Sequence, residues 1–299
     1  MGAQPPHEGA NSVQNNLDCR WREVPWVALR KDIESAVLAD GVASICDRAF
    51  SVCFGLKYVQ IGRSVKSIGD EAFLYCKSLK SITLPNSVVS IGSRAFQCCE
   101  DLSSIEVPNS VKEIGDEAFV SCCKMESITI PGSIEVLGAN LFAECENLSE
   151  ITVVGEGGNI RMVDGVLFNG DMTRLIWCSK KKSGSYEIPN TVKTIDCDAF
   201  YSCAELTSIT LPDSITKINY GVFCNCSGLE TVTIPRSVTS IGEHSFCSCS
   251  ALKSITIPSF VAYIYKNAFY NCSNLKTATV PKHLDCSYVF HDGVKIIRY

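Results

Sequence analysis

The motif Phe-x-x-Cys occurs nine times in this chain at a fixed spacing, and this repetition constrains the fold more than any other feature. The copies stand at Phe50/Cys53, Phe73/Cys76, Phe96/Cys99, Phe119/Cys122, Phe142/Cys145, Phe200/Cys203, Phe223/Cys226, Phe246/Cys249 and Phe269/Cys272. Neighbouring copies are 23 residues apart, except for one gap of 58 residues. A fixed period of this length is typical of a solenoid, in which each copy forms one coil that stacks on the next. Such a fold offers an extended surface instead of a closed pocket.

One repeat unit predicts the path of one coil. Residues 79–84 place apolar side chains at Leu79, Ile82 and Leu84, and the alternation of the last two around Thr83 predicts a strand. Pro85 ends this strand, since proline has no N–H for a neighbouring ladder. Residues 88–92 form a second short apolar segment, with a tight corner at Gly92. Residues 93–97 suit a single helical turn that points its Ala and Phe inward.

Coils stacked in register place like residues on like residues. Neighbouring strands about 4.8 Å apart then form a parallel sheet. The sequence therefore predicts an α/β repeat solenoid, a right-handed stack with a parallel β-sheet, short helical turns and one inserted β-hairpin. Two columns are expected to build the core, and they include Phe73, Phe96 and Phe119 with Cys76, Cys99 and Cys122.

The 18 cysteines fit a core column better than a disulfide framework. A column of nine cannot pair completely within itself, so we expect free, buried thiols. Cys224 and Cys226, with Cys247 and Cys249 in the next coil, could together hold Zn²⁺. The favoured alternative places Cys226 and Cys249 in the core column and turns the other two away. The exposed members of the pairs Cys98-Cys99 and Cys122-Cys123 leave a redox role as a further possibility.

The gap of 58 residues equals 23 plus 35, so one coil carries about 12 extra residues. Asn169-Gly170 between two apolar runs is a strong hairpin signal, and we expect the hairpin to project from the stack. Aromatic and basic residues at irregular positions are the candidate partner-binding residues: Phe168, Arg174 and Trp177 in the hairpin, and Tyr263 and Tyr265 in the last regular coil. The alternative is that these side chains cover an open end of the solenoid.

Composition narrows the function classes further. The net charge of −5 with scattered Lys and Arg argues against a nucleic-acid partner, and no apolar run is long enough to insert into a membrane. The four histidines lie in no recognisable catalytic or metal motif, so we expect neither enzyme activity nor a cofactor. The predicted organisation is a disordered leader at 1–20 and a solenoid at 21–299. Within the solenoid we expect an N-terminal cap at 21–49, regular coils at 50–154, the enlarged coil at 155–189, regular coils at 190–281 and a C-terminal cap at 282–299.

The full pattern Leu-x-x-Ile-x-Leu-Pro-x-Ser-Val-x-x-Ile-Gly-x-x-Ala-Phe-x-x-Cys resembles the BspA-type leucine-rich repeat, a 23-residue class. Residues 79–99 and 102–122 match it almost position by position. The resemblance implies a recognition or adhesion role toward a protein or extracellular-matrix ligand, typically at a cell surface. Buried reduced thiols favour the cytoplasm instead, so the sequence leaves the compartment open. The alternatives are a module that self-assembles or presents another domain, and a thiol-based metal or redox protein.

Overall fold

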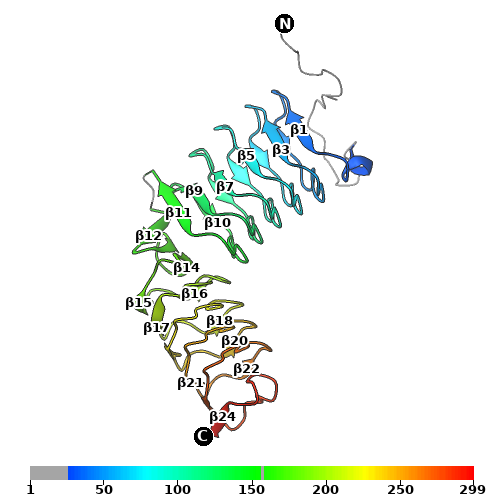
Figure 1. Ribbon diagram of the computed structural model, residues 1–299. Helices are drawn as coiled ribbons and strands as arrows, with labels where there is room; N and C mark the ends of the chain where they lie inside the picture. The colour runs from blue at the N-terminus through cyan, green and yellow to red at the C-terminus, as the bar shows by residue number, and fades with distance from the viewer. Residues whose placement is uncertain (1–25, 156–157) are drawn as a thin grey trace.

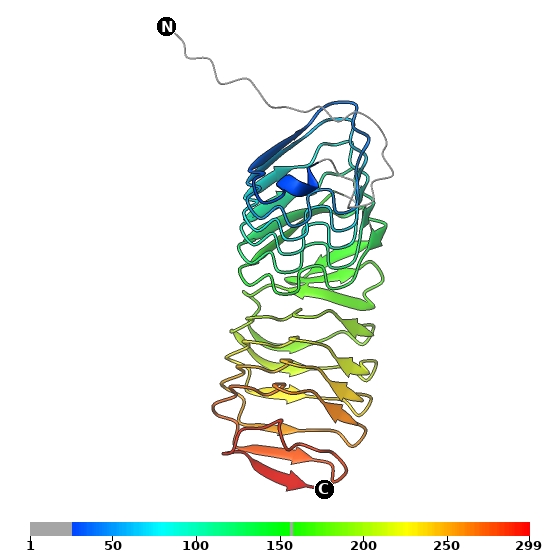
Figure 2. The same ribbon diagram turned by 90° about the vertical axis from the view of Figure 1, so that its right-hand side faces the viewer.

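The computed structural model describes residues 26–155 and 158–299 as a bent rod of stacked coils. Each coil lies on the next in register, as the view in Figure 2 shows. Residues 23 positions apart are paired, for example Val59 with Ile82 and Ile105 with Ile128. The predicted parallel-sheet solenoid is therefore confirmed. The predicted leader at 1–20 lies outside the described residues.

Two sides of each coil are short strands. The main sheet side carries β1 (Ser35–Leu38), β3 (Tyr58–Ile61), β5 (Ser81–Thr83), β7 (Ser104–Glu106), β9 (Ser127–Pro131), β11 (Glu150–Val154), β15 (Gly184–Glu187), β17 (Leu206–Thr210), β19 (Thr231–Thr233), β21 (Ser254–Thr256), β23 (Thr277–Val280) and β24 (Lys295–Arg298). The second side carries β2 (Ser44–Ile45), β4 (Ser67–Ile68), β6 (Ser90–Ile91), β8 (Glu113–Ile114), β10 (Val136–Leu137), β16 (Thr194–Ile195), β18 (Lys217–Ile218), β20 (Ser240–Ile241) and β22 (Tyr263–Ile264). The strands expected at 79–84 and 88–92 are thus β5 and β6.

The third side of each coil is a row of tight turns, and the predicted helical turns are wrong. A 3-10 helix, η1 (Val27–Leu29), is the sole helix among the described residues. In the coil of Phe96, the N–H groups of Arg94, Phe96 and Cys98 each donate to a carbonyl of the next coil at 2.8 Å. These N–H groups are therefore not available for bonds within a helix. Arg94 and Cys98 also take positive φ angles of 55° and 58°, which a right-handed helix excludes.

The phenylalanine column forms the spine of the core. The rings of Phe73, Phe96 and Phe119 stack with centroids 5.3 Å and 5.7 Å apart, and all three side chains are fully buried. Trp26 stacks on the first ring, Phe50, at 5.3 Å and donates its indole N–H to the carbonyl of Ala49. The side chain of Trp26 therefore covers the first coil.

Close approach of neighbouring coils explains the glycine that recurs directly after the strands of the second side. A Cβ atom added at Gly92 would lie 2.6 Å from the backbone nitrogen of Asp70, and one at Gly115 would lie 2.4 Å from that of Ser93. Such contacts would push the coils apart. The glycine is therefore needed because the backbones touch there, and the tight corner itself is a secondary reason.

The column cysteines satisfy backbone carbonyl groups inside the stack. The thiol of Cys99 donates to the carbonyl of Phe73 at 3.3 Å, one coil back. Equivalent bonds of 3.0–3.3 Å join Cys76, Cys122, Cys145, Cys226, Cys249 and Cys272 to the phenylalanine of the preceding coil. These seven cysteines form no disulfide and are buried. A small thiol that donates weakly fits this position, as the sequence suggested.

Burial should make these thiols unreactive in the folded protein. Desolvation raises the pKa of Cys145 and of Cys272 to about 12, so almost no thiolate forms near neutral pH. We expect iodoacetamide at pH 7.5 to label the half-exposed Cys98, Cys123 and Cys247 first. The column cysteines should react only after unfolding in guanidinium, as peptide mass spectrometry can measure. Equal labelling rates for Cys98 and Cys99 in native protein would contradict the buried column.

The extra residues of the enlarged coil form an insert of three strands, β12 (Ile160–Val163), β13 (Val166–Asn169) and β14 (Arg174–Cys178). Antiparallel pairing joins β12 to β13 and β13 to β14, so the hairpin predicted at Asn169-Gly170 is present. A second tight turn joins β12 to β13 at Asp164 and Gly165, which both have positive φ. Strand β14 then pairs with β16, which places the insert inside the stack.

The insert divides the apolar core in two. Leu167 and Trp177 pack with the first core, which contains the coils from Ile45 to Ile151. Val166 and Phe168 pack with the second core, which continues from Ile188 to Val289. We call the coils from β1 to β11 the first stack and those from β15 to β24 the second stack. The two stacks run in different directions in Figure 1, with the insert between them.

Candidate functional site

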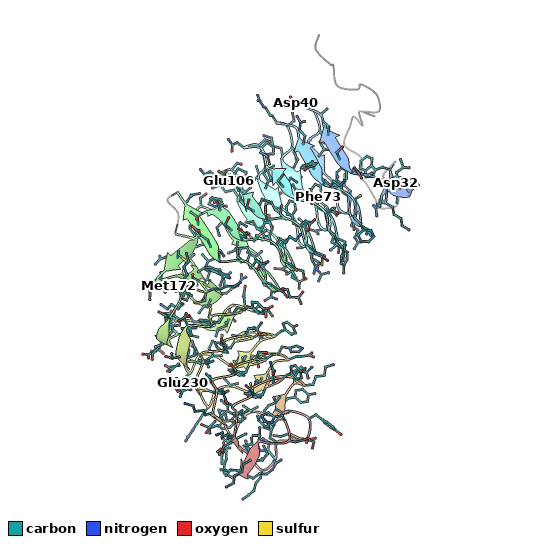
Figure 3. The ribbon with its side chains drawn as sticks, in the orientation of Figure 1. Asp32, Asp40, Phe73, Glu106, Met172 and Glu230 are labelled. Atoms are coloured by element: carbon teal, nitrogen blue, oxygen red, sulfur yellow. The ribbon has the colours of Figure 1, made fainter. Side chains whose placement is uncertain are left out.

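The hairpin residues expected to meet a partner are buried. Phe168 has no exposed surface and Trp177 is 6% exposed, because the two faces of the insert pack against different cores. The prediction that the hairpin projects and offers these rings to a ligand is therefore wrong. Met172, in the loop between β13 and β14, is labelled at the level of the insert in Figure 3.

Arg174 connects the insert to both stacks. Its guanidinium donates to the carboxylate of Asp196, with Nε 2.8 Å from Oδ1 and Nη2 2.6 Å from Oδ2. Nη1 donates to the carbonyl of Leu137 at 2.8 Å, and Nη2 also donates to the carbonyl of Gly138. The side chain of Arg174 is 18% exposed and that of Asp196 is 7% exposed. Arg174 therefore holds the fold together instead of facing a partner, which corrects the sequence-based prediction.

Backbone N–H groups of the first stack meet carboxylates of the second stack at the same place. The N–H of Asn140 donates to Asp196 at 3.1 Å, and that of Glu144 donates to Asp198 at 3.0 Å. We call these five residues, Asn140, Glu144, Arg174, Asp196 and Asp198, the joint. Sequence reasoning missed the joint. The signal available was a pair of aspartates at repeat positions where the regular coil of Phe96 has Gly92 and Arg94.

The two tyrosines predicted in the last regular coil are exposed. Tyr263, on β22, is 56% exposed, Tyr265 is 48% exposed and the nearby Phe260 is 66% exposed. The rings of Tyr263 and Tyr265 meet edge to face, with centroids 4.6 Å apart and planes at 79°. We call Phe260, Tyr263 and Tyr265 the aromatic patch. Both predicted tyrosines are therefore accessible to a partner, and their binding role stays a prediction.

The outward residues of the main sheet form a polar strip. Thr83 and Glu106 are exposed, and Glu106 is labelled in Figure 3 on the sheet side of the first stack. A groove crosses the strip between β5 and β7, where the hydrogen-bonded sheet is interrupted. Its polar lining comes from Thr83, Asn86, Glu106, Asn109 and Thr129. The lining of this groove has no aromatic side chain, so the groove is a weaker candidate than the aromatic patch.

The four cysteines considered for zinc do not converge on one point. The thiols of Cys226 and Cys249 point into the core column and donate to the carbonyls of Phe200 and Phe223. Cys224 and Cys247 lie on the half-exposed turn, and burial raises the pKa of Cys224 to about 12. Among the residues that the structure describes, no group of three or more His, Cys, Asp or Glu side chains is placed to hold a metal ion.

The repeat region matches a known family along most of its length. The family described as BspA type Leucine rich repeat region, in six copies, matches residues 30–162 and 177–293. The chain belongs to this family. The interruption at 163–176 falls on the insert, where β13 and the start of β14 depart from the repeat.

Solved structures of other repeat proteins of this kind share the fold. The crystal structure of the pneumococcal vaccine antigen PcpA is 27% identical, with a TM-score of 0.74, over 89% of this chain and 68% of that one. A leucine rich cell surface protein from Faecalibacterium prausnitzii is also 27% identical, with a TM-score of 0.59, over 89% and 87% of the two chains. A leucine-rich repeat protein from Eubacterium ventriosum, 22% identical with a TM-score of 0.66 over 93% and 84%, supports the fold alone. No curated protein sequence gives a significant match.

Within the described residues of this BspA-type repeat chain, no helix has the length and apolar character needed to cross a bilayer.

Proposed function

We propose that this leucine-rich-repeat chain is a non-catalytic recognition scaffold that binds a protein or extracellular-matrix ligand through the aromatic patch. The observation that carries the proposal is the exposure of two rigidly placed tyrosines where the preceding coil carries small residues. Tyr263 pairs in register with Ser240, and Tyr265 stands at the repeat position of Gly242. The repeat fold itself does not require aromatic side chains at these positions.

The aromatic patch has the properties of a binding anchor. Tyrosine contributes a large contact area at a low entropic cost, and tyrosines are enriched among the residues that dominate binding energies. Strand β22 and the edge-to-face contact between the two rings limit their motion before a ligand binds. A pre-organised site loses less conformational entropy on association than a flexible one. The phenol groups add hydrogen-bonding capacity at the rim of the patch.

Two structural neighbours support a place at the cell surface for this chain. One is described as a vaccine antigen and the other as a cell surface protein. A chain exposed to the exterior would meet matrix proteins directly. Burial of the column cysteines shields their thiols from oxidation there, so free thiols in the core are compatible with this location.

The binding proposal predicts a specific loss in a double variant that restores the repeat residues. Tyr263→Ser with Tyr265→Gly should weaken binding to an immobilised matrix protein about tenfold or more, since two anchor residues are lost. Biolayer interferometry against fibronectin, laminin and collagen would measure the change. Tyr288→Ser, which removes an 89% exposed tyrosine outside the patch, is the control.

The control variant should bind like the unmodified chain, and circular dichroism should show the same fold for all three proteins. Unchanged binding by the double variant would contradict the assignment of the patch. A lack of binding to all three matrix proteins by the unmodified chain would contradict the choice of an extracellular-matrix ligand.

A further inference from the structure

The joint contains a buried carboxylate at a place where the regular coils use backbone carbonyl groups. We propose that the joint tightens and loosens with the protonation of Asp198, so that pH sets how firmly the two stacks are held together. This inference is independent of the proposed function, because it concerns contacts within the chain.

In the regular coils, the backbone N–H groups at this position donate to backbone carbonyl groups of the next coil. In the coil of Phe96, the N–H groups of Arg94 and Cys98 donate to the carbonyls of Asp116 and Val120, both at 2.8 Å. Asn140 and Glu144 occupy the same repeat positions in the last coil of the first stack, and their N–H groups donate to carboxylates. The insert has replaced the next coil, and the side chains of Asp196 and Asp198 take over its role. Two hydrogen bonds between the stacks are therefore accepted by carboxylates instead of backbone carbonyl groups.

Asp198 is enclosed in the joint. The residue is 7% exposed, and its carboxylate lies directly over Gly221 of the following coil. A Cβ atom added at Gly221 would lie 1.7 Å from Oδ1 of Asp198, so the glycine makes the room that the carboxylate fills. Oδ2 of the same carboxylate accepts the N–H of Glu144. Asp198 is thus fixed between the first stack and the second.

The surroundings of Asp198 supply little positive charge. Arg174 directs its guanidinium to Asp196, and among the described residues no ion pair involves Asp198. The ionisable groups that interact with Asp198 from the elements around it are acidic or neutral, namely Glu144, Cys145, Cys197, Tyr220 and Cys224. An ionised Asp198 in the closed joint is therefore a buried anion with one backbone donor, which is unfavourable.

This environment moves the pKa of Asp198 toward neutral pH. Burial raises the pKa of Asp198 from 3.8 to about 6, the Glu144 N–H lowers it, and the Glu144 charge raises it further. Between about pH 4 and pH 6, Asp198 is therefore protonated in the closed joint and ionised in an opened, hydrated joint. Stability of the closed joint is highest at acidic pH and falls as pH rises through this window. The difference between these two pKa values makes the ratio of opened to closed joint about tenfold higher at pH 7.5 than at pH 5.0.

Hydrogen exchange measured by mass spectrometry tests this proposal on the full chain. Exchange rates at pH 5.0 and pH 7.5 are first corrected for the intrinsic pH dependence of amide exchange. We expect protection in a peptide covering 139–146 to fall about tenfold between the two pH values, while protection in 93–100, a regular turn, stays unchanged. In Asp198→Asn the joint peptide should keep the same protection at both pH values. Asparagine tolerates the positive φ of 55° at this position, so the variant should fold.

Asp70→Asn provides the matched control. The carboxylate of Asp70 also accepts a backbone N–H of the next coil, that of Ser93 at 2.7 Å, but Asp70 is exposed in the regular stack. This variant should retain the full pH dependence of the joint peptide. The proposal would be overturned by a joint peptide whose protection in unmodified protein is independent of pH, or whose pH dependence persists in Asp198→Asn.

Discussion

Replacing Phe119 by alanine is expected to lower the free energy of unfolding by about 3–5 kcal/mol. Phe119 is fully buried, and its ring stacks between those of Phe96 and Phe142 at 5.7 Å and 6.1 Å. Alanine would leave a cavity in the middle of the column that rings on both sides cannot fill, because each ring is fixed by its own coil. Loss of apolar contact and loss of ring stacking both add to the cost.

Thr129→Ala is the matched control for this prediction. Thr129 lies in β9 of the next coil, but its side chain faces outward on the polar strip. We expect a change of less than about 1 kcal/mol, since surface substitutions in strands affect stability weakly. Guanidinium unfolding followed by circular dichroism would measure both variants. Equal destabilisation by the two substitutions would contradict the assignment of the phenylalanine column to the core.

Replacing Arg174 by alanine should cost about 3–5 kcal/mol as well, for an electrostatic reason. The substitution leaves the 7% exposed carboxylate of Asp196 without its bidentate partner, and the carbonyls of Leu137 and Gly138 lose their donors. Because these contacts join the two stacks, unfolding should also become less cooperative. Thermal unfolding monitored by calorimetry would show a lower and broader transition.

Arg94→Ala tests whether burial is the cause of this effect. Arg94 pairs with Glu117 at 2.7 Å, but the two side chains are 50% and 31% exposed. An exposed pair of this kind contributes about 0–1 kcal/mol, so this variant should unfold nearly like the unmodified protein. If Arg174→Ala proved no more damaging than Arg94→Ala, the joint would not hold the stacks together in the way described.

The repeating parts of this molecule were predictable from the sequence because every coil obeys the same local rules. The alternation of apolar and polar side chains after Ile82 predicted β5, and the short apolar segment at 88–92 predicted β6. The helical turn at 93–97 was wrong because its N–H groups bond to the next coil, which a single repeat unit does not reveal. Hydrogen bonds to carbonyl groups 22 residues further along the chain outweighed the local preference for a helical turn.

For the insert, the sequence pattern predicted the local structure but not its position in the fold. The hairpin at Asn169-Gly170 was predictable from turn chemistry, but its place between the two cores was not. Phe168 and Trp177 looked like exposed anchors because they depart from the repeat. They are buried because β13 and β14 have a core on each face, so neither face has to be polar.

The contacts of the joint could be identified only from the three-dimensional structure. Arg174 and Asp196 are 22 positions apart, and Asn140 and Asp196 are 56 positions apart, in segments of different repeat phase. No periodicity links such residues. The column of free thiols was, by contrast, predictable, because Cys76, Cys99 and Cys122 share one repeat position and one hydrogen-bond geometry.

Ring-to-ring nuclear Overhauser contacts in phenylalanine-labelled protein would show whether like side chains stack on one another from coil to coil. The structure predicts one unbroken chain of contacts through Phe50, Phe73, Phe96, Phe119 and Phe142, and a second through Phe200, Phe223, Phe246 and Phe269. The two chains should be separate, because the insert lies between them. Contacts between rings two coils apart, such as Phe73 and Phe119, or an absence of contacts between adjacent coils, would contradict the stacked solenoid.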